Sequence, residues 1–471
     1  MNNSSAPLSL GTQPVGKLLI QYAIPAVIGM IAMSIYNITD SIFIGHGVGP
    51  LALSGIAISF PIMTLGAAFG ALIGVGASAL LSIRLGQKDY DSANYILGNV
   101  VTLNLILGIG LSIPVLIWLT PILKFFGASP DVLPYAYDFM FVIVAGNVVV
   151  HLFMGLNALM RSSGYPKEAM YAAIATVIFN IILNPLFIFG FGWGIRGSAL
   201  ATVISQFLVL LWQIYFFTDK TKFLYFKNGI YKLRKAIVSG IFSIGLAPFL
   251  LNASSSVVII LLNRQFTYYG GDLAVGAYGI VNRVAFLFVM IVFGINQGMQ
   301  PIAGYNYGAG LYGRVKEVLN KTIFIGVIVM TAGFIIVELF PHAVAGAFTR
   351  DKMLIDMTAS GLRYVFMFYS LAAVQIVAST FFQSIGKAYL SIILSVTRQV
   401  ILLIPLILFL PKFLDITGVW LSMPIADLLS FIICVILLRM QYKKLEGNSP
   451  FVLRDEVPNV SRINTGGKNE F

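Results

Sequence analysis

Charged residues are scarce in this chain of 471 residues: only 10% are Asp, Glu, Lys or Arg, whereas 58% are hydrophobic. Soluble domains carry about 25% charged residues. A soluble protein of this composition would lack the polar surface needed to cover its core. The scarcity of charge therefore excludes a set of soluble domains and favours a chain that lies mostly in lipid.

Metal-binding and redox side chains are also rare. Cys434 is the single cysteine, which excludes a disulfide framework, a cysteine-based zinc site and a haem attachment motif. The three histidines, His46, His151 and His342, lie far apart in the sequence and are expected to be packing or helix-end residues. Phosphate-binding loops, nucleophile elbows and HExxH zinc motifs are missing. We expect no cofactor and no enzymatic activity.

The chain is rich in long apolar runs. Runs of about 20 to 28 residues match helices that cross a hydrocarbon core about 30 Å thick. The N-terminal segment is polar and lacks a cleavage pattern, so the first run is a span and not a signal peptide. Spans are predicted near residues 18–44, 52–83, 95–120, 133–160, 170–191, 198–217, 237–263, 273–303, 318–340, 354–384, 388–410 and 417–438.

Landmarks of the first half recur in order in the second half. Pro25 recurs as Pro248, Gly86 as Gly308 and Tyr90 as Tyr312. Six spans per half give both halves the same orientation, as in transporter folds built from parallel repeats. The sequence thus predicts an all-α membrane protein of about twelve transmembrane helices, in two pseudo-symmetric six-helix lobes around a central cleft.

Four regions follow from these spans. We predict an N-terminal lobe (1–217), a basic linker (218–236), a C-terminal lobe (237–440) and a disordered tail (441–471). Most Lys and Arg fall on the side that carries both termini, which is the bias of cytoplasmic loops. We therefore interpret the net charge of +12 as topology and not as nucleic-acid binding. The expected location is the inner membrane with both termini cytoplasmic, as a monomer whose basic loops contact lipid headgroups.

Few ionisable side chains fall well inside the spans: Asp40, Arg283, Arg398 and Asp427. Such residues are functional candidates because a charge in hydrocarbon is costly. A lone buried carboxylate such as Asp40 either binds a cation or takes up a proton. Asp427 aligns with Gln206 across the repeat, and Arg398 on the neighbouring span could neutralise it as a structural pair.

Neutral polar side chains recur at helical spacing in the first half. Asn180 and Asn184 share one helix face, as do Ser198, Thr202 and Gln206. Pro185 leaves the carbonyl of the residue four positions earlier without its helical donor. If these faces converge on Asp40, they form an oxygen-rich pocket suited to a proton or Na⁺. The alternative is that these residues are hydrogen-bonding contacts between helices.

A family resemblance rests on motifs spread over residues 10–440. They are Ile24–Pro25, Tyr36–Asn37–Ile38–Thr39–Asp40, Ala52–Leu53–Ser54–Gly55, Leu85–Gly86–Gln87, Asn157 to Arg161, Asn180 to Pro185 and Asn296 to Pro301. With these motifs the chain resembles the multidrug and toxic compound extrusion (MATE) transporters, especially their bacterial MepA-like branch.

The resemblance implies a coupling site and a substrate cleft. Coupling to H⁺ or Na⁺ would involve Asp40, Asn180, Asn184 and Thr202. Asn157 matches a polar cleft position of the family, and we assign Tyr36, Asn37, Gln206 and Arg283 to the same substrate cleft. Many relatives carry a second acid where Asn184 stands, and some branches place acids on spans 7 and 10, where this chain has none in mid-span.

The implied function is secondary active efflux of organic, often cationic, small molecules in exchange for H⁺ or Na⁺ by alternating access. A flippase for lipid-linked saccharides, from the same superfamily, is the alternative, although it would need a more cationic cleft. A membrane enzyme or a channel fits less well, because catalytic motifs are missing and the chain is a two-lobed repeat.

Overall fold

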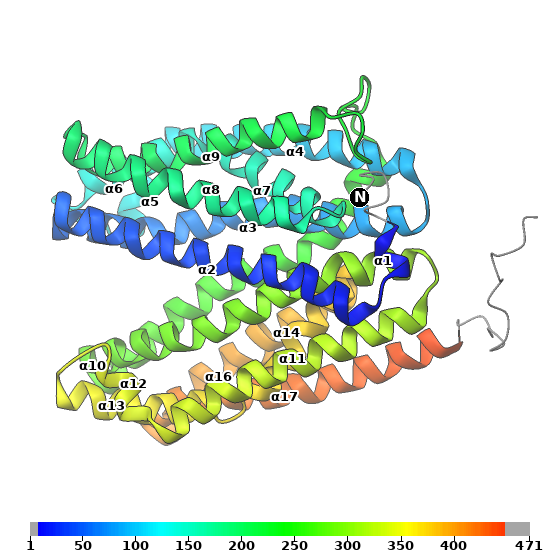
Figure 1. Cartoon of the computed structure of the whole chain (residues 1–471). Helices are drawn as coiled ribbons and strands as arrows, with labels where there is room; N and C mark the ends of the chain where they lie inside the picture. Colours follow the sequence, from blue (N-terminus) through cyan, green and yellow to red (C-terminus); the bar gives the residue numbers. More distant parts are fainter. Residues whose placement is uncertain (1–7, 448–471) are drawn as a thin grey trace, which may run out of the picture.

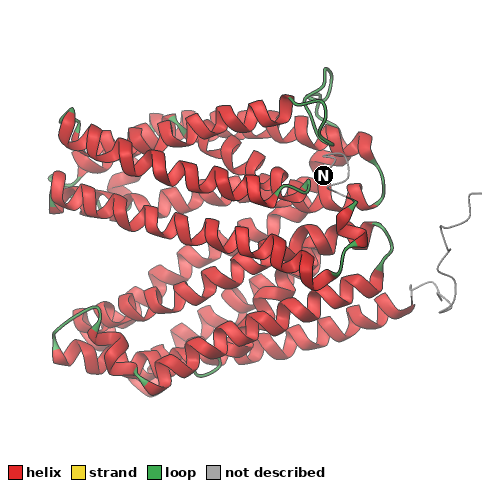
Figure 2. Ribbon diagram, viewed as in Figure 1, coloured by secondary structure: helices red, strands yellow, loops and turns green. Residues whose placement is uncertain are grey.

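The computed structural model describes residues 8–447, except for the side chain of Asn37, and contains no strand in that range (Figure 2). The first lobe consists of α1 (Ser9–Thr12), α2 (Val15–Gly47), α3 (Pro50–Gly86), α4 (Tyr90–Ile117), α5 (Leu119–Phe125), α6 (Leu133–Ala145), α7 (Asn147–Ser162), α8 (Pro166–Pro185), the π-helical turn η2 (Leu186–Gly190) and α9 (Gly194–Thr218).

The second lobe begins after the linker. It consists of α10 (Lys235–Gly308), α11 (Tyr312–Leu339), α12 (Pro341–Gly346), α13 (Lys352–Phe366), α14 (Tyr369–Ser384), α15 (Ala388–Val396), the π-helical segment η3 (Thr397–Leu403), α16 (Ile404–Phe409) and α17 (Pro411–Gly447).

Nine helices of the described residues are long and apolar enough to cross a membrane. Two further pairs, α6 with α7 and α13 with α14, pass the same test together and are bent by 52° and 53°. Helix α10 is itself two helices joined at Gly271, whose φ of 68° is not helical. With α10 counted as two, the described residues hold the twelve spans predicted from the sequence.

The two lobes meet at one end of the molecule, which we call the linker end because it carries residues 219–234 (Figure 1). There the backbones touch through glycines. A Cβ atom built on Gly245 of α10 would lie 1.7 Å from the Leu72 oxygen of α3, and one on Gly76 would lie 2.2 Å from the Ile241 oxygen. Only glycine permits such close crossings. Toward the other end, which we call the far end, the helices of the two lobes diverge (Figure 1).

The segment that leads into the first lobe is held by the second lobe. Arg314 donates from Nη2 to the Leu10 oxygen at 3.0 Å and to the Gln13 oxygen at 2.5 Å. Asn306 also donates to the Leu10 oxygen, at 3.0 Å, and its own Oδ1 accepts from Arg314 Nε at 2.8 Å. These bonds tie α1 across the lobe boundary at the linker end.

The segment that leads into the second lobe is held by the first lobe in turn. Asn99 of α4 donates to the Ile230 oxygen at 3.2 Å and to the Lys232 oxygen at 3.0 Å, and it accepts from the Arg234 amide at 3.0 Å. Thr102 adds a bond to the Tyr231 oxygen at 3.0 Å. Each lobe is therefore hydrogen-bonded to the segment of chain that leads into the other lobe.

Helix α2 presents three distinct faces. One carries a stripe of isoleucines that are 40–61% exposed and follow helical spacing: Ile20, Ile24, Ile28, Ile31, Ile35, Ile38 and Ile42. Such a stripe is suited to lipid. A second face packs on α10 through Ala23 and Val27, and the third carries Asp40 toward α8 and α9. Because α2 contacts both lobes, a change at Asp40 can be transmitted between them.

Helix α17 runs to Gly447, beyond the predicted end of the second lobe at residue 440. Gln441 and Leu445 in this extension are only 3% and 2% exposed, so residues 441–447 are packed helix and not a disordered tail. The rest of the predicted tail, residues 448–471, lies outside the described residues.

Truncation can test this boundary. A chain that ends at Gly447 is expected to reach the membrane at the level of the full chain and to transport normally. A chain that ends at residue 440 should accumulate at a lower level, because it loses the buried Gln441 and Leu445. Membrane-fraction blots and detergent size-exclusion profiles give the comparison. Equal levels for both truncations would show that the last two turns of α17 contribute nothing to stability.

Candidate functional site

Asp40 lies near the far end of α2 and joins three helices. Its Oδ1 accepts a hydrogen bond from the Asn184 side-chain amide on α8 and another from Ser198 Oγ on α9, at 2.7 Å. Asn184 and Ser198 are fully buried, whereas Asp40 is half-buried. The carboxylate is therefore fixed by two neutral donors from the inside of its own lobe.

A second group of polar side chains lies one helical turn away on the same helices. Tyr36 and Thr202 share a hydrogen bond of 2.8 Å between their hydroxyl oxygens. Asn180 donates to Thr202 Oγ1 at 3.4 Å. On each of the three helices, the two groups are four residues apart, so they share one helix face. The pairs are Tyr36 and Asp40 on α2, Asn180 and Asn184 on α8, and Ser198 and Thr202 on α9. Both groups therefore lie where these three helices face one another.

These residues leave an excess of acceptors. Asn180 Oδ1 and Asn184 Oδ1 are buried and have no hydrogen-bond partner, and no Lys, Arg or His of residues 8–447 forms an ion pair with Asp40. Buried oxygens without donors are unusual in proteins. An unpaired carboxylate beside two free amide oxygens can take up a proton, or supply oxygen ligands to a small hard cation such as Na⁺. Groups of three or more His, Cys, Asp or Glu that would hold a transition metal do not occur in the described range.

The local sequence explains how the helices position this cluster. Pro185 follows Asn184 and has no amide hydrogen, so the α-helical bonding pattern ends there. The chain continues as η2, a π-helical turn that ends in a bond from the Phe191 amide to the Leu186 oxygen. Irregular turns of this kind are common at functional sites. The sequence also predicts the convergence of Asn180, Asn184 and Thr202 on one site.

Ser198 was among the polar residues expected to converge on Asp40, but it was not one of the four residues to which ion coupling was assigned; the structure places it in direct contact with the carboxylate. Tyr36, predicted to be in the substrate cleft, lies in the Asp40 group through Thr202. Asn37 belongs to α2, but its side chain is outside the described part of the structure. Gln206 is 8% exposed and follows Thr202 by one turn; its Oε1 has no partner.

Asn157 lies apart from this group. Its amide donates to the Ala169 oxygen at 2.9 Å, and its Oδ1 accepts from Arg161 at 3.4 Å. Ala169 precedes Asn180 by about three turns of α8, toward the linker end. The contacts of Asn157 join α7 to α8 near the linker end, and the structure does not bring it together with the other predicted site residues.

In the second lobe, Arg398 and Asp427 contact each other directly. Arg398 Nε, in η3, lies 2.6 Å from Asp427 Oδ1 on α17. The side chains are 25% and 6% exposed, so the carboxylate is buried and the guanidinium is partly accessible. Next to Arg398, Gln399 donates to Ser255 of α10 at 3.2 Å. The second lobe thus holds a compensated ion pair where the first lobe holds an uncompensated carboxylate.

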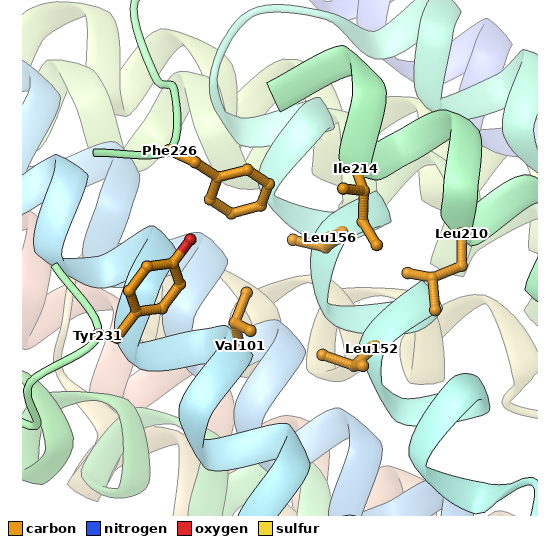
Figure 3. A pocket seen from close by; sticks show the side chains of 7 residues that line it. All are labelled: Val101, Leu152, Leu156, Leu210, Ile214, Phe226 and Tyr231. Carbon is orange, nitrogen blue, oxygen red and sulfur yellow. The ribbon is translucent and has the colours of Figure 1, made fainter. Parts of the chain in front are cut away.

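The described pockets lie elsewhere. Figure 3 shows side chains of α4, α7, α9 and the linker that converge on a space of about 200 Å³; they are Val101, Leu152, Leu156, Leu210, Ile214, Phe226 and Tyr231. Except for the Tyr231 hydroxyl these groups are apolar and cannot orient a charged compound. A second pocket, of about 390 Å³, lies beside Lys387 and Lys444 at the linker end. Neither pocket includes the Asp40 group.

Two helical lobes that close at one end and carry polar side chains within their spans define a membrane protein of the two-lobed transporter class. The MatE family model matches residues 25–186 and 244–409, which correspond to the two lobes. The chain belongs to the MatE family, and the predicted family and fold class are confirmed.

The relatives agree with this assignment. The multidrug export protein MepA of Staphylococcus aureus (strain MRSA252) is 28% identical over 415 residues, covering 88% of this chain and 91% of the relative. The outward-facing conformation of a multidrug resistance MATE family transporter of the MOP superfamily superposes with a TM-score of 0.88 at 25% identity, covering 94% and 99% of the two chains. The MATE multidrug transporter DinF-BH has a TM-score of 0.86 at 36% identity, covering 93% and 98%.

Proposed function

We propose that this protein is a secondary active multidrug efflux transporter, which exports small organic compounds in exchange for H⁺ or Na⁺ by alternating access. One observation supports ion coupling above all others. Asp40 is a carboxylate inside a span that forms no ion pair with any described residue, and it lies beside two buried amide oxygens that lack donors. The kinship with multidrug transporters supports the substrate class.

The geometry supports a mechanism in which ion binding changes α2. In the conformation described, the linker end is closed by glycine contacts and the lobes diverge at the far end. An ion that enters from the far end neutralises Asp40 and changes its bonds to Asn184 and Ser198. Helix α2 then shifts against α10, substrate leaves, and the lobes rearrange to open the linker end. The cycle requires that the ion bind the two conformations with different affinity.

The flippase alternative has less support. A lipid pyrophosphate carries several negative charges and needs several cationic partners. Of the two arginines that the sequence places well inside the spans, Arg398 is paired with Asp427, which leaves Arg283. Channel or enzyme function has no supporting site among the described residues.

Transport in proteoliposomes tests the proposal. Purified full-length protein is reconstituted, and accumulation of a fluorescent organic cation is followed with the Na⁺ gradient and the pH gradient imposed separately. We expect uptake into inside-out vesicles that depends on one of the two gradients and collapses when that gradient is removed. Dye movement that follows only the dye gradient would contradict ion coupling.

Topology is a separate prediction. We place the protein in the inner membrane as a monomer. The linker and both termini are placed in the cytoplasm, because basic residues concentrate at the linker end. Reporter fusions within residues 218–235 and after Gly447 should report cytoplasm. Fusions after His46 and Gly127, at the far end, should report the outside. An external reporter at the linker would invert the assignment.

A further inference from the structure

Arg283 has no role in the coupling site. It lies in α10 within a span, its side chain is exposed, and within residues 8–447 it forms no ion pair. A charged side chain at this depth is costly unless it faces water or a partner. The direction in which it points therefore decides what it can bind.

The helix face of Arg283 is the face that contacts the first lobe. Gly294 and Gly298 of α10 pack directly on α2: Cβ atoms built there would lie 2.6 Å from Val27 Cγ2 and 2.6 Å from the Ala23 amide nitrogen. Arg283, Leu287, Gly294 and Gly298 are separated by four, seven and four residues, which keeps them on one side of an α-helix. Arg283 thus points toward the first lobe and not toward lipid.

This face is covered at one end of α10 and open at the other. Gly294 and Gly298 are buried against α2, whereas Leu287 is 57% exposed. A Cβ atom on Gly279, one turn from Arg283, would have no neighbour within 4 Å. The part of this face around Leu287 and Gly279 is thus largely uncovered, and it lies toward the far end, where the helices of the two lobes diverge (Figure 1). We call it the open face of α10; it comprises Gly279, Arg283 and Leu287.

The register of the two helices fixes the depth of Arg283. Helices α2 and α10 run antiparallel here, since Gly298 meets Ala23 and Gly294 meets Val27. Arg283 precedes Gly294 by 11 residues and is therefore level with Ile38, which follows Val27 by 11 residues. Asp40 is at the same depth, but its carboxylate is directed into its own lobe by Asn184 and Ser198. Arg283 and Asp40 lie across the space between the lobes without neutralising each other.

No acid of the part of the chain that the structure describes forms an ion pair with Arg283. Asp427 is engaged by Arg398. Asp272 is 11 residues away on α10, which corresponds to about 16 Å along the helix axis. The open face of α10 therefore carries a net positive charge.

We propose that Arg283 binds the anionic group of transported compounds, and that the substrates include organic molecules bearing a carboxylate or sulfonate, zwitterions among them. A guanidinium offers paired donors to such groups, and the pairing is stronger away from bulk water. A compound with only positive charge gains nothing from Arg283. The inference rests on the proposed efflux function and specifies its substrate class.

A pair of dyes that differ by one methyl ester tests the inference. Free-acid rhodamine 110 is a zwitterion, and its methyl ester, rhodamine 123, is a cation. Initial efflux rates are measured for both in cells that express wild type, Arg283→Gln or Arg283→Lys. Arg283→Gln should slow efflux of the free acid about tenfold or more and change that of the ester less than about twofold, because a charged donor pair is lost. Arg283→Lys should retain part of the free-acid rate.

Arg264→Gln is the matched control. Arg264 is an exposed arginine of the first of the two helices that α10 contains, before the break at Gly271, and it follows Val257 and Ile260, which are 49% and 55% exposed, on a stripe suited to lipid. It should leave both rates unchanged. Three outcomes would overturn the inference. They are an equal loss of efflux rate for both dyes in Arg283→Gln, an unchanged free-acid efflux rate in that variant, and export of the ester alone by wild type. Wild-type export of neither dye would overturn the proposed function and the inference with it.

Discussion

Replacing Asp40 by asparagine is expected to abolish coupled efflux while leaving folded protein in the membrane. Asparagine has nearly the same shape, and its Oδ1 can still accept from Ser198 Oγ and the Asn184 amide. It cannot bind a proton or carry the charge that attracts a cation. The ion gradient would then have no group through which to change the relative stability of the two conformations.

Efflux of a fluorescent cation, measured with a surface-level blot, distinguishes this outcome from misfolding. Asp40→Asn should match cells without the protein in efflux and match wild type in level. Asp40→Glu should retain partial activity, because it keeps the charge with one added methylene. Wild-type efflux by Asp40→Asn at normal expression would contradict coupling through the first lobe.

The neutral neighbours should have graded effects. Asn180→Ala and Thr202→Ala each remove one uncharged group, and Ser198→Ala removes one donor to the carboxylate. A neutral hydrogen bond contributes about 0.5–1.5 kcal/mol, so each change should shift the apparent ion affinity about 2- to 10-fold. A total loss from any of these single changes would mean that the site depends on geometry more than on charge.

Helical spacing predicted which polar side chains of the Asp40 group share a helix face, and the family resemblance implied that these faces meet at Asp40. Polar residues four apart in an apolar span must share a face, and a polar face must find partners inside the lobe. This logic brings Asn180, Asn184 and Thr202 together. It could not separate Ser198, which bonds the carboxylate, from Gln206, which does not, because both follow the same spacing and their depth depends on how α9 packs.

Other features depend on contacts between distant segments and had no local signal. Asn157 matched a family motif, yet its side-chain amide donates a hydrogen bond to the Ala169 oxygen near the linker end. The bond from Arg314 to Leu10 joins residues of different lobes, and the bond from Asn99 to Ile230 joins the first lobe to the linker that leads into the second. Periodicity within one span contains no information on such pairings. The spans themselves were predictable, since length and hydropathy reflect the thickness of the bilayer.

Replacing Asp427 by asparagine is expected to lower the amount of folded protein sharply. Asp427 is 6% exposed and lies 2.6 Å from Arg398 Nε, so its neutralisation leaves a partly buried guanidinium without its counter-ion. Removing one member of a buried pair costs about 3–5 kcal/mol in soluble proteins, which is a large share of the stability of a typical domain. The effect should therefore appear in protein level and detergent stability before it appears in transport.

The double variant Asp427→Asn with Arg398→Gln separates stability from coupling. Replacing both charges removes the unpaired guanidinium along with the carboxylate, and such replacements are often close to neutral for stability. We expect the double variant to recover much of the wild-type level, and its efflux per molecule to stay near wild type because Asp40 is intact. Detergent size-exclusion profiles give the folded amount, and dye efflux gives the activity. If Asp427→Asn alone is abundant and stable but inactive, the pair is not a structural one, and Asp427 belongs with Asp40 among the coupling residues.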